Sequence, residues 1–287
     1  MATMRDIRRR IRTVRNIQQI TKAMKMVATA RLQKAEAKAA AARPYSDEMV
    51  AVMRHLSASA RGEIEHPLLA VREPVNTAYL VITSDRGMAG SYNTNVIRRV
   101  VEITKTLDLD HLKLITVGKR GRGFFAKRGF EIAADFPMAS SEVSFADARA
   151  ISRSLIAMFE SGEVDAVKVI YTRFASAMRQ YVTELPLLPA IPPSLEEERE
   201  TVEEYLFEPE PEVLLGRLLP RYVDNQVYRA MIESLASEHG ARMTAMTSAT
   251  DNAGEMIDRL TLEFNRARQS AITTELTEIV SGAEALK

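Results

Sequence analysis

The sequence contains no cysteine, so disulfides and thiolate metal sites are excluded. Long apolar runs are also missing, because no stretch approaches the roughly 20 consecutive apolar residues of a membrane span. The N-terminus lacks the apolar segment that follows the first charges of a secretion signal. Hydrophobic residues nevertheless make up 46% of the 287 residues, enough for a substantial core. We therefore expect a soluble, unsecreted protein, with a reducing compartment as the default.

Helix breakers are scarce at the start of the chain, where the first proline is Pro44 and the first glycine is Gly62. This composition favours one very long helix over residues 3–57, about 80 Å in length, with Pro44 as the place for a kink. Its apolar stripe, at spacings of three and four, is formed by Ile7, Ile11, Val14, Ile17, Ile20, Met24 and Val27. Alanines follow this stripe and would let a second helix come close.

The other end of the chain has the same character, since no proline follows Pro220. A helix over residues 221–284 would be about 95 Å long. Its heptad positions are Ala253, Ile257, Leu260, Phe264, Ala267, Ala271 and Thr274. Neither helix has an apolar face broad enough for burial in a small globule, and their lengths match. We therefore predict that the two chain ends form an antiparallel coiled coil.

Between these helices the pattern alternates between strand and helix, which predicts a mostly parallel sheet and an α/β fold class. The predicted strands are Thr77–Thr83, Leu112–Val117, Ala166–Thr172 and Gln180–Leu187. The predicted helices are Asn93–Leu107, Lys119–Arg128 and Phe145–Glu160. Prolines and a run of glutamates then predict an exposed connection to the last helix.

Charge is distributed unevenly, although the net charge is only +1. Residues 1–31 carry nine Lys or Arg against the single acid Asp6, whereas residues 194–212 carry nine Glu against Arg199. Such blocks mark solvated faces or contacts with partners. A nucleic-acid-binding coiled coil is one alternative, but the first forty residues have no aromatic side chain and the charges spread round the helix.

The segment Gly118–Gly123 is the strongest candidate for a phosphate site, because it follows a strand, precedes a helix and is rich in cations. Its spacing fails, since no Ser or Thr follows Lys119 and the glycines lack the dinucleotide pattern. A nucleotide-binding α/β enzyme with helical arms stays as a second alternative. No serine nucleophile is predicted, because the polar segment 83–93 lacks Gly-x-Ser-x-Gly.

Metal and acid–base chemistry also lack a pattern. The histidines, expected at the surface and without ligand spacing, are His55, His66, His111 and His239. The clustered carboxylates Glu196, Glu197, Glu198 and Glu200 lie in a charged linker, a poor place for perturbed pKa values. We therefore predict no catalytic residue, no metal site and no cofactor.

Three separated segments resemble the gamma subunits of F-type ATP synthases. They are Ile7–Ile11 with Asn16–Ala28, then Thr83–Asn93 at a strand end, and finally Ile272–Glu284. The last begins Ile-Thr-Thr-Glu-Leu-Thr-Glu. Together the three segments extend over nearly the whole chain, so the combination is highly specific.

This resemblance implies a non-catalytic rotor with three parts. Residues 1–60 and 212–287 would form a coiled coil inside a hexamer of alpha and beta subunits, and a Rossmann-like domain, 61–211, would lie beside the membrane. Proton flow through a ring of c subunits would turn the chain together with epsilon. The asymmetric shaft would then force the three beta sites through different nucleotide affinities. Membrane association would occur only through the complex, and no nucleic acid would be bound.

The resemblance also implies contacts at matching positions. Those expected to meet the catch loops of beta are Arg268, Gln269 and Thr273. Those expected near the acidic lever of beta are Met24, Lys25 and Arg242. Those expected to touch epsilon and the c ring are Phe207, Glu208, Pro209 and Glu210. Plain packing is a second interpretation for two of them, coiled-coil packing for Met24 and a buried anchor for Phe207.

Some features depart from the family pattern. Pro220 falls where the family is helical, so the last helix is expected to bend or to start late. Met88 and Ala89 replace a commoner Leu-Cys pair. A regulatory insertion with paired cysteines is missing, which excludes thiol control, and the lack of a transit peptide favours a bacterial origin at the cytoplasmic face of the plasma membrane.

Overall fold

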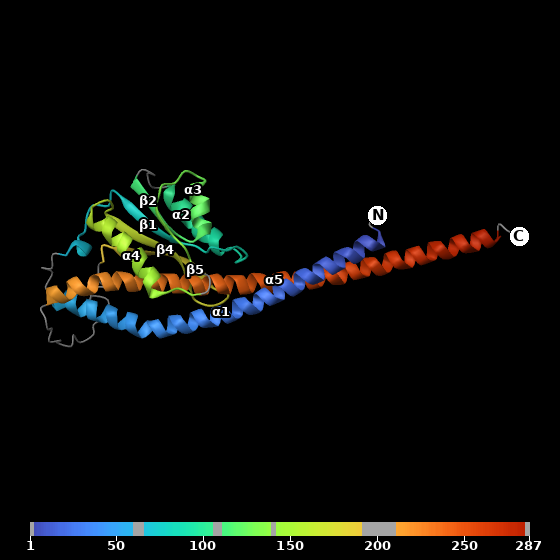
Figure 1. The fold of residues 1–287 in the computed structure, drawn as a ribbon, viewed down its shortest axis with the longest axis horizontal. Helices are drawn as coiled ribbons and strands as arrows, with labels where there is room; N and C mark the ends of the chain where they lie inside the picture. The colour runs from blue at the N-terminus through green and yellow to red at the C-terminus, as the bar shows by residue number, and fades with distance from the viewer. Residues whose placement is uncertain (1–2, 60–65, 106–110, 139–141, 191–210, 285–287) are drawn as a thin grey trace. The chain divides into compact units, whose positions relative to one another are not determined.

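The structure is a computed structural model that describes residues 3–59, 66–105, 111–138, 142–190 and 211–284. The chain divides into two compact units. Unit 1 comprises Met1–Ala28 and Met243–Lys287, and unit 2 comprises Thr29–Arg242. Two long helices, α1 (Met4–Ser59) and α5 (Pro211–Glu284), each contribute to both units (Figure 1).

A five-stranded sheet with the order β3-β2-β1-β4-β5 forms the centre of unit 2. Its strands are β1 (Thr77–Ile82), β2 (Leu112–Val117), β3 (Ile132–Phe136), β4 (Ala166–Phe174) and β5 (Gln180–Leu188). Neighbouring strands run parallel except β4 and β5, which confirms the predicted mostly parallel sheet. The edge strand β3 was not expected, because its side chains are only half-buried or exposed and leave no apolar run in the sequence.

The side chains of β1 alternate between the two faces of the sheet. Leu80 and Ile82 belong to the larger core, which also contains residues of α1, α4 (Phe145–Glu160) and α5. Val81 belongs to the smaller core, to which α2 (Tyr92–Thr104) and α3 (Lys119–Ala126) contribute. Helices therefore cover both faces of the sheet (Figure 1), as a parallel sheet requires.

Local sequence explains where the shorter helices begin. Ser144 caps α4, since its hydroxyl accepts a hydrogen bond from the Asp147 amide at 3.1 Å. The Asp147 carboxylate accepts one in return from the Ser144 amide at 3.2 Å. This reciprocal pair satisfies two amides that lack intrahelical partners and sets the predicted start of α4.

Prolines do not interrupt the long helices. Pro44 lies inside α1 and Pro220 inside α5. The helix α5 begins at Pro211, so the expectation that it would start late, near 221, is wrong. An interior proline costs about 3 kcal/mol of helix stability. Burial of Leu215, Leu219 and Val223 in the large core offsets that cost.

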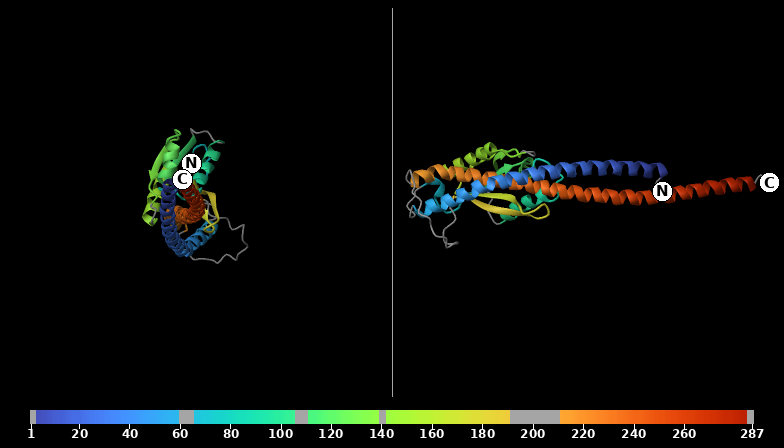
Figure 2. Two further views of the ribbon diagram at one scale, coloured as in Figure 1. Left: turned by 90° about the vertical axis from the view of Figure 1, so that its right-hand side faces the viewer. Right: turned by 90° about the horizontal axis from the view of Figure 1, so that it is seen from below.

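In unit 1 the two helices pack side by side (Figure 1 and Figure 2). The Thr250 hydroxyl donates to the Thr21 hydroxyl at 2.8 Å, and the Arg8 guanidinium lies 5.3 Å from the ring centroid of Phe264. Because the residue number rises in α5 as it falls in α1, the helices are antiparallel. The predicted coiled coil of the chain ends is confirmed.

Candidate functional site

The coiled-coil seam of unit 1 does not use the whole apolar stripe predicted for the first helix. Ile7 is buried, but Ile17 and Ile20 are 47% and 58% exposed. Thr21 and the half-buried Gln18 occupy the seam instead. Gln18 fits because it faces Gly254, where an added Cβ would lie 3.2 Å from the Gln18 Nε2 atom. Large apolar side chains of the first helix therefore remain on the outside of the coiled coil.

The last turns of α5 form a second exposed apolar surface in unit 1. The helix extends past the first residues of α1 (Figure 1 and Figure 2). Its exposed apolar side chains there are Ile272, Leu276, Ile279 and Val280, each between 48% and 68% exposed. Such a concentration of exposed apolar residues on one segment is typical of a surface that a partner covers. We call these four residues the C-terminal apolar surface.

The predicted contacts Arg268, Gln269 and Thr273 lie just before and within this segment, and all three are exposed. The Thr273 hydroxyl donates to the Gln269 carbonyl at 2.9 Å, one turn earlier. The hydroxyl is thus partly engaged with its own helix, while the Arg268 and Gln269 side chains extend from exposed positions. The structure places the three on consecutive turns of α5.

The other predicted contacts differ in accessibility. Met24 and Lys25 are half-buried in unit 1. Arg242 is buried, at 8% exposure, within unit 2. The predicted epsilon and c-ring contacts, Phe207, Glu208, Pro209 and Glu210, lie outside the described residues.

Arg242 belongs to a buried polar cluster that the sequence did not reveal. Its Nη2 atom lies 2.6 Å from Glu238 Oε1 and donates to the backbone oxygen of Gly87 at 3.2 Å. Burial raises the pKa of Glu238, and the Arg242 charge opposes that shift. Beside them lies His239, which is fully buried, so its expected surface position is wrong. The spacing of Glu238 and Arg242 by four residues was a signal for the pair, but not for its burial.

The glycines of the candidate phosphate loop have packing roles. Gly118 has φ +93, and a Cβ there would lie 2.3 Å from the Thr83 backbone oxygen. Gly121 donates its amide to the Thr83 hydroxyl at 2.9 Å, and a Cβ there would lie equally close to that hydroxyl. These glycines therefore let α3 approach β1 closely.

The start of α3 is also occupied by a carboxylate from the chain itself. Asp85 Oδ1 accepts a hydrogen bond from the Lys119 amide at 2.9 Å. A negative charge thus already lies where a phosphate would bind. A basic depression of about 500 Å³ remains beside the loop; its cationic lining residues are Lys119, Arg120, Lys127 and Arg128. Because Asp85 occupies the N-terminus of α3, this depression lacks the free helix N-terminus that distinguishes a phosphate site from a solvated basic surface.

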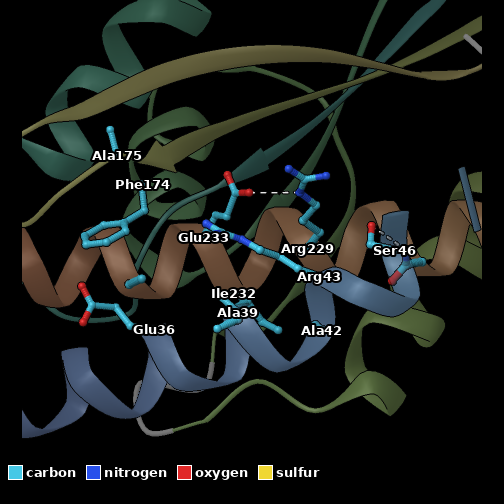
Figure 3. Close-up of a pocket in the computed structure, with 13 residues that line it drawn as sticks. Glu36, Ala39, Ala42, Arg43, Ser46, Phe174, Ala175, Arg229, Ile232 and Glu233 are labelled. Atoms are coloured by element: carbon cyan, nitrogen blue, oxygen red, sulfur yellow. Dashed lines mark hydrogen bonds and ion pairs between the residues drawn. The ribbon is translucent and has the colours of Figure 1, made fainter. Parts of the chain in front are cut away.

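A smaller pocket of about 280 Å³ lies between α1 and α5 in unit 2 (Figure 3). Ala39 and Ala42 form part of one wall, and Arg229 and Glu233 form part of another. Arg229 Nε donates to Glu233 Oε1 at 3.1 Å, whereas the buried Oε2 has no hydrogen-bond partner among the described residues. The pocket offers an acceptor to water or a small donor, but its lining contains no His, Cys or cluster of acids. Ser46 also lines the pocket, but its hydroxyl accepts a hydrogen bond from Asn225 Nδ2 at 3.0 Å, and no His in the lining could activate it as a nucleophile.

Two further features are absent from the part of the chain that the structure describes. No group of three or more His, Cys, Asp or Glu side chains there could hold a metal ion. No helix there is long and apolar enough to cross a membrane.

Comparison with known proteins gives consistent matches over the full length. A sequence profile described as ATP synthase matches residues 3–286. The chain is 49% identical over 287 residues to the ATP synthase gamma chain of Moorella thermoacetica, covering 100% of both chains. It is 48% identical over 293 residues to the gamma chain of Heliobacterium modesticaldum, again covering 100% of both.

Solved structures match as well. A chain from the central stalk and c ring of the Tetrahymena thermophila mitochondrial ATP synthase matches with a TM-score of 0.62 and 26% identity, covering 80% of this chain and 99% of that one. A chain from the Euglena gracilis mitochondrial enzyme matches with a TM-score of 0.66 and 18% identity, covering 99% and 94%. The second likeness concerns the fold alone.

Proposed function

This chain belongs to the ATP synthase gamma-chain family, and on that premise we propose that it is the central rotor shaft of a proton-translocating F-type ATP synthase. A ring of c subunits turns the chain together with epsilon. The coiled coil of the chain ends turns inside a hexamer of alpha and beta subunits. Its asymmetry drives the three beta sites in sequence through states of different nucleotide affinity, which couples rotation to ATP synthesis or hydrolysis.

The C-terminal apolar surface carries this proposal. Four large apolar side chains on the last turns of α5 are about half exposed or more, and Ile17 and Ile20 are exposed on α1. Exposed apolar area on an isolated helix end is costly unless a partner removes it from water. A surrounding sleeve of subunits supplies that cover on all sides, as a shaft requires.

The chain is a subunit of an enzyme complex and, we infer, has no catalytic residue of its own. The occupied start of α3 and the lack of His and Cys in the described lining of the pocket support this inference. In the proposed division, residues 1–60 and 212–287 form the shaft and 61–211 form the Rossmann-like domain. The complex holds this peripheral subunit at the cytoplasmic face of a bacterial plasma membrane.

Contacts with beta are proposed at two levels of the shaft. Arg268, Gln269 and Thr273 meet the catch loops of beta, which their exposure allows. Met24 and Lys25 face the acidic lever of beta. Arg242 is proposed for the same contact, and its burial limits it to a small exposed edge.

The foot of the rotor is proposed at Phe207, Glu208, Pro209 and Glu210, which bind epsilon and the c ring. Replacing Phe207, Glu208 and Glu210 together with alanine should weaken assembly with epsilon and the c ring, measured by co-purification and by binding of isolated epsilon. A matched control replaces Glu196, Glu197 and Glu200, which belong to the same acidic segment. Unchanged assembly in the first variant would remove the foot from this segment.

Single-molecule rotation tests the proposed function as a whole. The chain is assembled with the alpha and beta subunits of Moorella thermoacetica, and a bead is attached at Lys127→Cys, the only thiol in the chain. We expect ATP-driven rotation in one direction and no hydrolysis by the chain alone. A complex that hydrolyses ATP without turning the bead would contradict the proposal. Purification with nucleotide alone, or with nucleic acid, would favour the two alternatives instead.

A pair of variants tests whether the C-terminal apolar surface is buried by the surrounding subunits. The triple change Ile272→Ser, Leu276→Ser and Ile279→Ser removes apolar area that the sleeve would bury, at about 25 cal/mol per Å². It should weaken assembly by about tenfold or more. The control changes Thr274, Glu275 and Glu278 to serine; these residues lie in the same turns and are also exposed. Equal effects in both variants would mean that apolar contact does not hold the shaft.

A further inference from the structure

Arg242 is the only buried arginine among the described residues, and its contacts join distant parts of unit 2. Its Nη2 atom reaches Glu238 Oε1 at 2.6 Å and the Gly87 carbonyl at 3.2 Å. Its Nη1 atom lies 3.4 Å from His239 Nδ1. Gly87 lies 155 residues earlier in the chain, in the loop between β1 and α2. One guanidinium therefore bridges helix α5 and that loop.

Helix stability does not account for this pair. Glu238 is fully buried, and the removal of a carboxylate and a guanidinium from water has a large desolvation cost for each ion. Apolar residues of similar size in place of a buried ion pair are often neutral or stabilising. An apolar pair could not, however, donate a hydrogen bond to the Gly87 carbonyl. The contribution that only the ion pair makes is therefore the hydrogen bond that fixes the loop.

The loop that Arg242 holds is strained at its tip. Met88 has φ 61, a conformation that residues other than glycine rarely adopt, and its side chain is 62% exposed. Such strain persists only where the surroundings impose it. At the base of the loop, Asn93 Oδ1 accepts a hydrogen bond from the Ser84 amide at 2.9 Å. At the tip, the Arg242 contact to Gly87 is the corresponding restraint.

Arg120 restricts the same turn from another side. A Cβ added at Gly87 would lie 2.7 Å from Arg120 Nη2, so the backbone of the turn passes close to that guanidinium. Arg242 and Arg120 thus confine Gly87 between α5 and α3. The Arg242 contact therefore holds the turn against helix α5, and Arg120 bounds the turn on the side of α3.

We propose that Arg242 is a positioning residue, which with Glu238 ties the Gly87–Met88 turn to helix α5 so that the turn and this stretch of helix move as one body. Its significance rests on the proposed rotor function, because a shaft under torque must carry the adjoining domain without slack. The tie itself is a property of unit 2 and can be measured without rotation.

The experiment measures spin-label distances in the full chain, whose lack of cysteine permits specific labelling. In the first pair, spin labels are attached at Met88→Cys and Arg221→Cys, both at exposed positions of unit 2. In the control pair, spin labels are attached at Lys127→Cys and Arg221→Cys, so the measured distance reports on the position of α3 instead of the turn. We expect Arg242→Ala to broaden the distance distribution of the first pair and to leave the control pair narrow. Arg242→Lys, which keeps the charge but not the fork of donors, should give an intermediate width.

Hydrogen exchange supplies a second readout. Exchange at the amides of Met88 to Gly90 should speed up about tenfold in Arg242→Ala, as loss of one charge-assisted hydrogen bond predicts, while β4 amides stay unchanged. If both label pairs stay narrow, or if both broaden and exchange rises throughout unit 2, the tie is refuted. A chain that fails to rotate but gives the expected label distances would count against the rotor function and not against the tie.

Discussion

The two units differ in how far they bury their apolar side chains. In unit 2, Leu80, Ile115 and Val169 are fully buried in or beside the sheet. In unit 1, Ile20 and Leu262 are 58% and 62% exposed, and the seam relies on small or polar residues such as Thr21 and Ala28. A sheet domain that buries its own core is stable without help. A two-helix coiled coil with apolar residues on its outside depends on a covering partner.

The stability contrast gives the largest expected effect. Phe159→Ala, at a fully buried position in unit 2, should lower the free energy of unfolding by about 3–5 kcal/mol through lost burial and a cavity. Leu262→Ala, at an exposed position in unit 1, should change it by no more than about 0.5 kcal/mol. Urea unfolding of the full chain measures both. A similar loss in the two variants would remove the distinction between the units.

Contacts on the shaft should produce a moderate effect on rotation. A cation and a carboxylate 4 Å apart gain about 4 kcal/mol at an effective dielectric of 20, strong enough to bias partner conformations yet breakable on each turn. The double change Arg268→Ala and Gln269→Ala should slow turnover or loosen coupling by about threefold to tenfold, with torque only partly lost. Assembly should be intact, because packing along the coiled coil transmits most of the torque and does not depend on these two side chains.

The control for that variant is Glu263→Ala with Arg266→Ala, two exposed residues slightly earlier on α5. Single-molecule rotation measures turnover and dwell angles, and proton pumping by vesicles measures coupling. If all three are unchanged in the Arg268 and Gln269 variant, these residues have no part in the mechanism.

Alkaline pH should weaken unit 2 by a smaller amount. Burial, and then the neighbouring Glu233 charge, raise the pKa of Tyr171 to about 12. Tyrosine in an unfolded chain has a pKa near 10. Between these values the unfolded state binds fewer protons than the folded state, so the free energy of unfolding falls as pH rises from about 10 to 12. Tyr171→Phe should flatten part of this dependence in urea titrations. An equally steep fall in that variant would contradict the assignment.

The smallest expected effect is none at all. Because Asp85 occupies the start of α3, purified full chain should bind no ATP in calorimetry. Asp85→Asn removes the charge that competes with phosphate and is the informative comparison, since it would unmask any latent affinity of the basic depression. Stoichiometric micromolar binding by the unchanged chain would overturn the non-catalytic interpretation and revive the nucleotide-binding enzyme.

Most helices and strands were predictable because their signals are local. The strand Leu112–Val117, rich in apolar and β-branched residues, and the helix Phe145–Glu160, which Ser144 caps, have the predicted bounds. The strand β3 escaped because an edge strand needs no apolar run. The start of α5 at Pro211 escaped because burial of its first turns outweighs the proline penalty, which local sequence does not report.

The candidate site was predictable only in part, and for a related reason. Exposed positions such as Arg268 followed from resemblance to a family. Arg242 came from the same resemblance, yet its burial against Glu238 and Gly87 depends on a loop 155 residues away. The stripe through Ile17 and Ile20 was assigned to the seam because spacing shows that residues share a face. Spacing does not show which face meets the other helix.

By itself, the sequence determined the long terminal helices, the alternation of strands and helices apart from β3, and the absence of a Walker loop, because each depends on neighbouring residues. Only the tertiary structure decided that Gln18 rather than Ile17 enters the seam, that His239 is buried and that Asp85 occupies the start of α3. Each of those outcomes is set by contact between segments far apart in the chain. Side-chain volume, charge and hydrogen bonding across such contacts outweigh the preference of any single segment.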